Sequence, residues 1–332
     1  MSDLRSGDTT HIEAFTFGEP EPIRTAYDLV NTGLWAMGGQ WYEPPFDYRL
    51  LSKCYRATPH HGSALQVKRN ILVRSFIPHP LLSRQQFTAL VLDFLTFGNC
   101  YLHPIYSRLG NLMALDVPRA KYVRRGLDLD TYFWVPLYGQ EQAFATAPWH
   151  LMQPSIDQEV YGEPDYIGAL DSIQLNREAT TFRLRYYRNG SHAGFLLYTT
   201  GEKIDPIDQD FLRQALKDSK GPGNFRNFYM HITDGNKDSV NLIPISEIAA
   251  KDDFQAIKGQ TRDDQLAAHR VPPQLMGIIP NNTGGFGDIE KAASVFVANE
   301  LEPLQETLSE FNDMIGQEVI RFSSFSLSQP RS

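Results

Sequence analysis

Two long helical segments of matched length constrain the fold of this chain more than any other sequence feature. Residues 167–189 contain no proline, and at 1.5 Å per residue their helix would span roughly 35 Å. Residues 246–270 give a second helix of about 37 Å by the same rise, and Ser246 is suited to cap its N-terminus. Pro272 and Pro273 must end this helix, because proline lacks the amide hydrogen and crowds the preceding turn. Apolar residues recur at helical spacing in the first segment, at Leu175, Ala179, Phe182 and Tyr186.

The segment between these two helices, residues 193–245, is too short for a large core of its own. Its pattern predicts three strands and one helix, at 195–198, 228–232, 241–245 and 208–217. The simplest arrangement is therefore an antiparallel helix pair that carries this small unit at its far end.

The N-terminal half mixes helical and strand patterns. Ser83 and Gln86 have the spacing of a capping box, and Gly98 is suited to end the helix that follows. The apolar stripe of this helix consists of Phe87, Leu90, Val91 and Phe94. Turn signals separate four strand-like runs, at 100–102, 112–115, 132–135 and 149–152. The predicted fold class is therefore α+β.

Two polar clusters of the N-terminal half are predicted to be solvated. The segment Pro59-His60-His61-Gly62 separates two short helices, where a turn is favoured over a metal site. Lys121, Arg124 and Arg125 form a small basic cluster, for which a solvated edge is favoured over a ligand site.

A third long helix is predicted at residues 289–315. Asp288 can cap its N-terminus, and Pro303 is expected to kink it. The loop before it, from residue 276, is rich in glycine and asparagine and is expected to be flexible.

Composition limits the function classes. The formal net charge of −8 opposes tight general binding to DNA phosphates. Cys54 and Cys100 lie in apolar stretches and are predicted to be buried thiols, which argues against a disulfide framework and against structural zinc. The sequence offers neither a membrane span nor an apolar signal core after Met1, so we expect the protein to stay where it is made.

Two possible functional sites, a phosphate loop and a two-metal site, lack the residue pattern that their chemistry requires. The glycines from Gly284 to Gly287 lack the Gly-Lys-Ser/Thr of a phosphate loop and do not follow a strand. Asp252 and Asp263 would lie on one helix face but about 16 Å apart along the axis, too far for a two-metal nuclease. A solvated, charged helix face is favoured for them. We expect no enzyme, no cofactor and no metal.

A long run of residues resembles one known family. Lys251-Asp252-Asp253-Phe254 and the stretch from Thr261 to Gly277 (TRDDQLAAHRVPPQLMG) strongly resemble the portal proteins of tailed bacteriophages, and most closely the PBSX-type branch. Further segments fit the same branch, at 278–288, 290–293, 299–305, 98–101 and 161–164. The resemblance covers most of the chain.

The resemblance implies a portal fold and assigns a part of it to each region. These parts are an N-terminal arm and α+β wing (1–165), a stem helix (166–192), a small α/β clip (193–245), a second stem helix (246–275), a tunnel loop (276–288), and a long kinked helix with the C-terminal tail (289–332). In the tunnel loop, Asn281, Asn282 and Thr283 are expected to face the DNA channel. In the clip, Lys217, Lys220 and Arg226 are expected to be exposed and to bind partners.

The implied function is a ring, dodecameric in the capsid, that forms the DNA channel at one capsid vertex. Such a ring serves terminase-driven packaging, head-to-tail connection and DNA ejection. Its expected partners are further copies of the chain, the sliding DNA, terminase, capsid and scaffold proteins, and head-completion or neck proteins, with no membrane. Its expected location is the virion, and the host cytoplasm during assembly. A net negative charge suits a conduit, because strong phosphate contacts would stall the DNA.

Two other classes stay open at this point. One is a different structural protein of the head or neck, and the other is a nuclease or packaging enzyme. Imaging for a ring with a central hole separates them.

Overall fold

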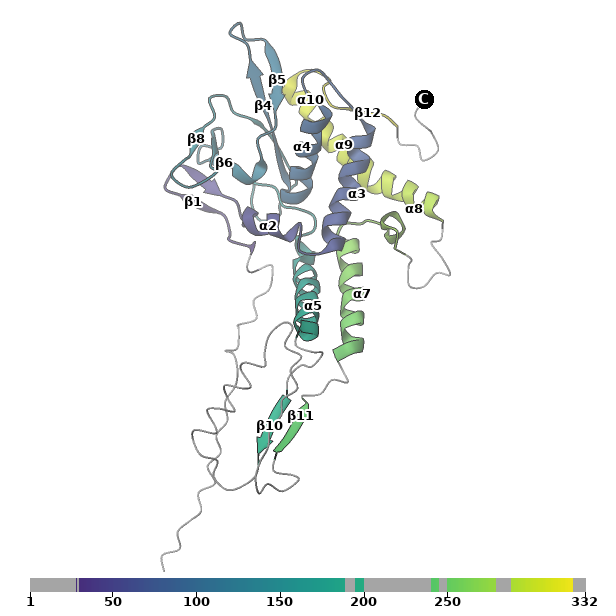
Figure 1. The fold of residues 1–332 in the computed structure, drawn as a ribbon. Coiled ribbons are helices and arrows are strands. Elements are labelled where there is room, and N and C mark those ends of the chain that lie inside the picture. The colour runs from purple at the N-terminus through teal and green to yellow at the C-terminus, as the bar shows by residue number, and fades with distance from the viewer. Residues whose placement is uncertain are drawn as a thin grey trace, which may run out of the picture.

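The computed structural model describes residues 28–188 apart from residue 29, and residues 195–199, 240–244, 250–278 and 288–324. Side chains are described in these ranges except at 186–188, in the two five-residue strands and at 250–254. Figure 1 shows a mixed body from which two helices project side by side. None of the helices in the described part of the chain is long and apolar enough to cross a membrane.

Three helices form one layer of the body: α2 (Tyr48–Cys54), α3 (Pro59–Ser75) and α4 (Arg84–Phe97). The predicted capping box of α4 is confirmed, because the Ser83 hydroxyl accepts from the Gln86 amide while the Gln86 side chain accepts from the Ser83 amide. All four residues of the predicted apolar stripe are buried. Each such side chain contributes about 1.5–3 kcal/mol when fully buried, so this face fixes α4 against the body.

The turn predicted at residues 59–62 is wrong, because α3 begins there. The Thr58 hydroxyl accepts from the His61 amide as an N-cap, and Pro59 occupies the first turn, where its missing amide costs nothing. Gly62 lies so close to the preceding segment that a Cβ would meet the Tyr55 carbonyl oxygen at 2.6 Å. His61 is consequently part of the core, with no exposed surface.

Two antiparallel sheets complete the body. The three-stranded sheet has the order β5 (Leu112–Asp116), β4 (Asn99–Tyr106), β9 (Trp149–Met152). The five-stranded sheet has the order β1 (Trp35–Met37), β2 (Trp41–Glu43), β6 (Val123–Gly126), β7 (Tyr132–Trp134), β8 (Gln142–Ala143). The four strands predicted at 100–102, 112–115, 132–135 and 149–152 are thereby confirmed.

Two glycines allow the start of β4 to pack against the segment before the projecting helices. Gly98 ends α4 with φ +68°, and a Cβ there would lie 2.5 Å from the Glu163 carbonyl carbon. The buried Asn99 amide group donates to the Gly162 carbonyl at 2.9 Å and accepts from the Gly162 amide at 2.7 Å. These contacts bring together segments 98–101 and 161–164, both of which carried the family resemblance.

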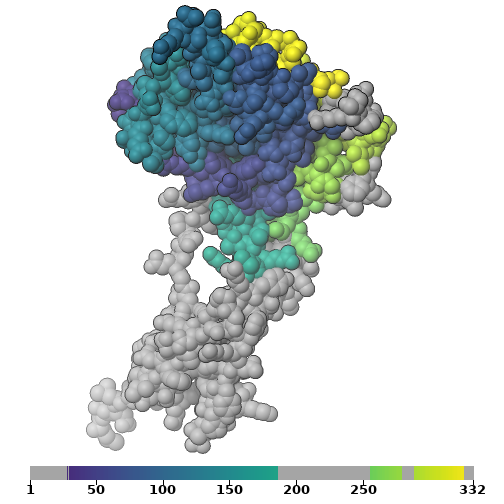
Figure 2. Space-filling model, turned by 45° about the horizontal axis from the view of Figure 1, so that its top comes forward, coloured from purple at the N-terminus to yellow at the C-terminus, as the bar shows by residue number. Residues whose placement is uncertain are grey.

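The two projecting helices are α5 (Leu170–Arg188), which follows a 3₁₀ turn at Ile167–Ala169, and α7 (Ala250–Ala268). They confirm the predicted helices, although α7 ends two residues earlier than expected. Beyond their far ends lies a separate antiparallel pair, β10 (Phe195–Thr199) and β11 (Val240–Pro244). Figure 2 shows α5 and α7 emerging together from one side of the body.

The predicted C-terminal helix is interrupted. It consists of α8 (Ile289–Phe296), a π-helical turn (Val297–Leu301), α9 (Glu302–Ser309) and α10 (Phe311–Ile315). The irregular turn therefore precedes Pro303, whose ring crowds the turn before it. The Asp288 cap of α8 is confirmed, because its side chain accepts from the Lys291 amide. Finally, β12 (Arg321–Phe322) pairs with β3 (Phe76–Ile77).

Candidate functional site

The site residues predicted from the sequence lie outside the described residues. These are Asn281, Asn282 and Thr283 in the expected tunnel loop, and Lys217, Lys220 and Arg226 in the expected clip. The helix and strand predicted at 208–217 and 228–232 lie outside them too. The structure does describe the elements on either side of both segments, and it shows how these elements are attached to the body.

A ladder of buried polar side chains attaches α7 to the body. Thr261, Gln265 and His269 follow one another at i, i+4 and i+8 and are at most 3% exposed. Asn176 of α5 donates to the Thr261 hydroxyl at 2.7 Å, and the Thr58 hydroxyl donates to the Gln265 carbonyl oxygen at 2.6 Å. Ser172 of α5 contacts Asp264 and Gln265, whereas Asn176 contacts Thr261, so residue numbers rise along α5 while they fall along α7 and the two helices are antiparallel.

The last rung of the ladder is a pair of histidines. His61 Nδ1 lies 2.8 Å from His269 Nε2, and Tyr166 packs against both rings. Burial lowers the pKa of His61 to about 4 and that of His269 to about 2. Both imidazoles are therefore neutral at neutral pH, with one donating to the other.

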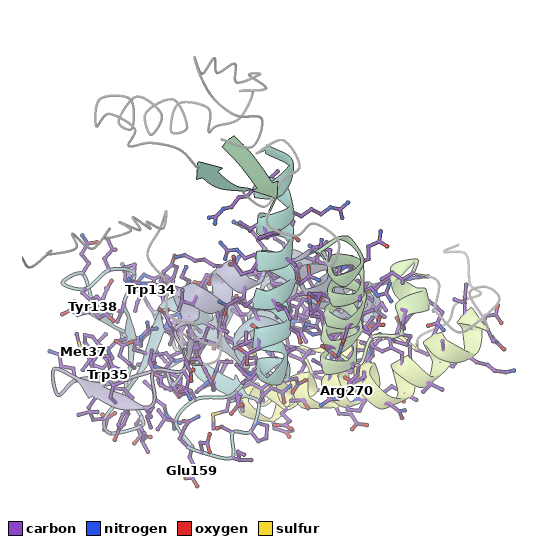
Figure 3. All side chains as sticks on the ribbon, turned by 90° about the horizontal axis from the view of Figure 1, so that it is seen from below. Trp35, Met37, Trp134, Tyr138, Glu159 and Arg270 are labelled. Carbon is purple, nitrogen blue, oxygen red and sulfur yellow. The ribbon has the colours of Figure 1, made fainter. Side chains whose placement is uncertain are left out.

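An ion cluster, buried at Lys68 and Glu300 and exposed at Arg270, joins the end of α7 to the C-terminal helices. Glu300, in the π-turn, lies 3.1 Å from the ammonium group of the buried Lys68 in α3. Arg270, just beyond α7, lies 3.3 Å from Glu300 and 3.7 Å from Asp165. Arg270 has φ +53°, in the left-handed region that non-glycine residues seldom adopt. Figure 3 places Arg270 between α7 and the C-terminal helices, away from Trp35, Met37 and Tyr138 of the opposite edge.

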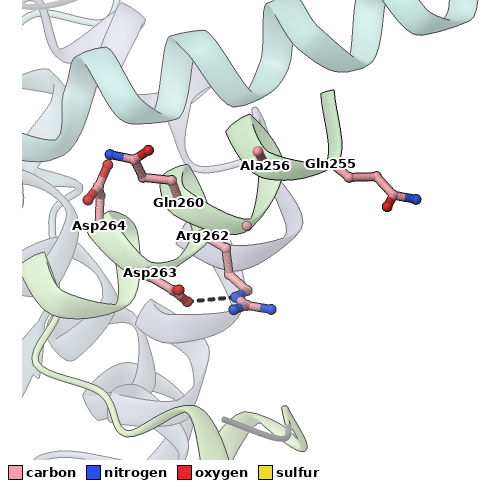
Figure 4. A pocket seen from close by; sticks show the side chains of 7 residues that line it. Gln255, Ala256, Gln260, Arg262, Asp263 and Asp264 are labelled. Carbon is pink, nitrogen blue, oxygen red and sulfur yellow. Dashed lines mark hydrogen bonds and ion pairs between the residues drawn. The ribbon is translucent and has the colours of Figure 1, made fainter. Parts of the chain in front are cut away.

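The outer face of α7 carries a shallow hollow (Figure 4). Its acidic residues are already paired: Arg262 binds Asp263 at 2.7 Å, and Asp264 accepts from the Ser172 hydroxyl at 3.0 Å. Across the described residues, no group of three histidine, cysteine or acidic side chains could hold a metal ion. The arrangement fits the predicted charged helix face.

The basic cluster at residues 121–125 is only partly a solvated edge. Arg124 forms a buried ion pair with Glu43 at 2.8 Å, which joins strands β2 and β6.

Cys100 is buried and Cys54 half-buried, and both are free thiols.

Sequence reasoning missed the polar ladder and the Glu300 cluster. The signal was available, since Thr261, Gln265 and His269 have the spacing of one helix face. Polar residues are usually exposed, so this spacing alone does not predict a buried face.

A mixed body with an antiparallel pair of projecting helices, a two-stranded sheet beyond them and a broken C-terminal helix is the architecture of phage portal proteins. A crystal structure of an HK97 family phage portal protein from Corynebacterium diphtheriae has a TM-score of 0.60 to this chain at 13% identity, covering 82% of this chain and 94% of its own. A chain in the neck of a native gene transfer agent particle with C12 symmetry has a TM-score of 0.58 at 17% identity, covering 87% of each.

Sequence comparison narrows the assignment further. Residues 54–329 match the family described as phage portal protein. The chain is 49% identical to the probable portal protein of Escherichia phage P2, over 95% of this chain and 92% of the relative. It is 34% identical to the probable portal protein of Haemophilus phage HP1, over 81% and 80%. The chain therefore belongs to the phage portal protein family, and its role is that of a portal at the capsid vertex of a virion.

Proposed function

We propose that twelve copies of this chain form a closed ring whose central channel conducts double-stranded DNA. The observation that carries the proposal is the pair α5 and α7, which leaves the body antiparallel with β10 and β11 beyond its far end. In this proposal residues 1–165 are the N-terminal arm and the wing, 166–192 and 246–275 are the stem, 193–245 is the clip, 276–288 is the tunnel loop, and 289–332 is the long kinked helix with its tail.

The exposed face of α5 supports a ring. The predicted apolar stripe is only partly buried within the chain, since Ala179 is buried whereas Leu175 is 49% and Phe182 44% exposed. The face that packs inside the chain instead carries Leu170, Ile173 and Asn176. If a neighbouring subunit covers the exposed half of each of these two side chains, each contributes about 1 kcal/mol to the free energy of association. In a closed ring, a head-to-tail interface repeats this gain at every subunit.

The net charge of −8 supports weak, sliding contact with DNA rather than tight binding. We propose that Asn281, Asn282 and Thr283 line the channel, because uncharged polar groups make contacts that do not bind phosphate strongly. We also propose that the chain is a non-enzymatic member of the PBSX-type branch, on the segments that carry the resemblance.

We further propose partners for each end of the ring. Lys217, Lys220 and Arg226 in the clip would bind the terminase motor during packaging and a head-completion or neck protein later. The wing would contact capsid and scaffold proteins during assembly in the host cytoplasm. Reversing the three clip charges is expected to abolish motor docking and DNA packaging while rings still form, and unimpaired packaging would remove the clip assignment.

The ring is tested by imaging and native mass measurement of the chain co-produced with its capsid and scaffold proteins. We expect rings with a central hole for the natural chain, and none for Leu175→Glu. The matched control is Ile156→Glu, which places the same charge at a residue that is 98% exposed outside the stem, and it should retain rings. A stable monomer that cleaves DNA with a metal ion would refute the portal assignment.

A further inference from the structure

One side chain within the π-turn at Val297–Leu301 is bound by residues from two other parts of the chain. The Glu302 amide donates to the Val297 carbonyl, a bond over five residues where an α-helix spans four. Within this turn the Glu300 side chain is almost buried and is bound by Lys68 from α3 and Arg270 from the end of α7. A π-turn is a costly local conformation that often marks a functional position.

The sequence also fits the alternative, an uninterrupted α-helix. Apolar or small residues are buried at 293, 297, 301, 304 and 308. This spacing of three and four residues is the one that a regular α-helix presents on a single face. The apolar pattern therefore does not by itself select the π-turn, whereas the ion cluster binds a residue within that turn.

Closing the turn would move α8 as a unit. Each residue of an α-helix rotates the chain by about 100°. A π-turn holds one residue more than the α-helical turn that would replace it, so its conversion to an α-helix would rotate α8 by about 100° relative to α9. A side chain about 5.5 Å from the helix axis would be displaced by roughly 8 Å. Because α8 begins at Ile289, this rotation would re-aim the chain that leads into it.

We propose that Glu300, Lys68 and Arg270 form a latch that holds the 297–301 turn in its π form, and that opening the latch converts the turn to an α-helix and rotates α8. Arg270 couples the latch to α7, because it lies just beyond the end of this helix and its amide donates to the Ala267 carbonyl. A strain on α7 would therefore reach the C-terminal helix through one carboxylate. The latch does not depend on the ring, whereas its effect on the tunnel loop rests on the proposed function.

The test measures the distance between α8 and α9 in the full chain. Spin labels are attached at Val295→Cys and Glu306→Cys, both exposed positions, in a chain that also carries Cys54→Ser; Cys100 has no exposed surface. With the latch intact we expect a single distance. Glu300→Gln keeps the shape of the side chain and removes its charge, and it should add a second population shifted by several ångströms.

A second variant protects the test from misfolding. Lys68→Met with Glu300→Met removes both buried charges, so neither is left unpaired, and it should show the same second distance. Glu310→Gln, an exposed acid on the same stretch of helices, is the control and should keep the single distance. If the folded double variant keeps the distance of the natural chain, the latch does not exist. Because this measurement needs no assembled ring, its failure is distinct from a failure of the portal proposal.

Discussion

Replacing Gly98 by alanine should destabilise this chain more than the same change at any freely placed glycine. Gly98 has φ +68°, and its new Cβ would meet three backbone atoms of Glu163 and Pro164 at 2.5–2.8 Å. The left-handed backbone costs an L-residue about 1–2 kcal/mol, and forcing backbone apart in a packed region costs about 1–3 kcal/mol more. The expected loss is therefore about 3 kcal/mol.

Gly110 provides the matched control, since it has φ +81° and nothing within 4 Å of a built Cβ. Gly110→Ala should therefore cost only the backbone term of about 1–2 kcal/mol. Thermal unfolding of the two variants, followed by circular dichroism, isolates the steric contribution. A loss of 1 kcal/mol lowers the melting temperature of a chain of this length by about 2–4 °C. Gly98→Ala should therefore melt several degrees below Gly110→Ala. Equal melting temperatures would refute the packing of segment 98–101 against 161–164.

Two further predictions concern the polar ladder. The folded-state pKa of His61 (about 4) and that of His269 (about 2) lie below the unfolded value of about 6.5. The contribution of the two neutral histidines to the free energy of unfolding is therefore complete above pH 6.5 and is lost as the pH falls. For His61 this loss amounts to about 3 kcal/mol by pH 4. Denaturant unfolding at pH 7 and pH 5 should show a smaller loss of stability for His269→Gln than for the natural chain, and an unchanged pH dependence would contradict the neutral pair. Gln265→Ala should lower the free energy of unfolding by about 2–3 kcal/mol, because it leaves a buried partner unpaired. The control Gln260→Ala, on the exposed side of the same helix, should change it by less than about 0.5 kcal/mol. Equal losses would show that the ladder contributes nothing to stability.

Local chemistry was sufficient to predict much of this fold. The cap at Ser83 and the stripe of α4 depend on residues within a few positions of one another, and both were confirmed. Alternation and turn signals likewise identified the strands at 132–135 and 149–152. The projecting helices α5 and α7 followed from their proline-free length and from the stop at Pro272.

The main predictions that failed concern residues whose partners lie far away in the sequence. His61 was expected in a turn, yet it is buried against His269, which lies 208 residues further along the chain. Glu300, within the π-turn, is bound by Lys68, which lies 232 residues earlier in the sequence. No pattern within either segment shows that such a partner exists, so proline was the only visible cause for an interruption of the C-terminal helix.

The attachment of α7 favours a single register over maximum stability. A hydrogen bond such as that between Thr58 and Gln265 contributes about 1 kcal/mol net, less than the 1.5–3 kcal/mol of a buried leucine. An apolar seam would tolerate a slip along the helix, whereas a slip of this ladder leaves each buried polar group unpaired at about 1–3 kcal/mol. The ladder thus fixes where α7 lies along α3 and α5, and the Arg270–Glu300 contact fixes where it ends. A helix held at successive turns in this way is expected to move as a unit, and this is the motion that the proposed latch would pass to the π-turn.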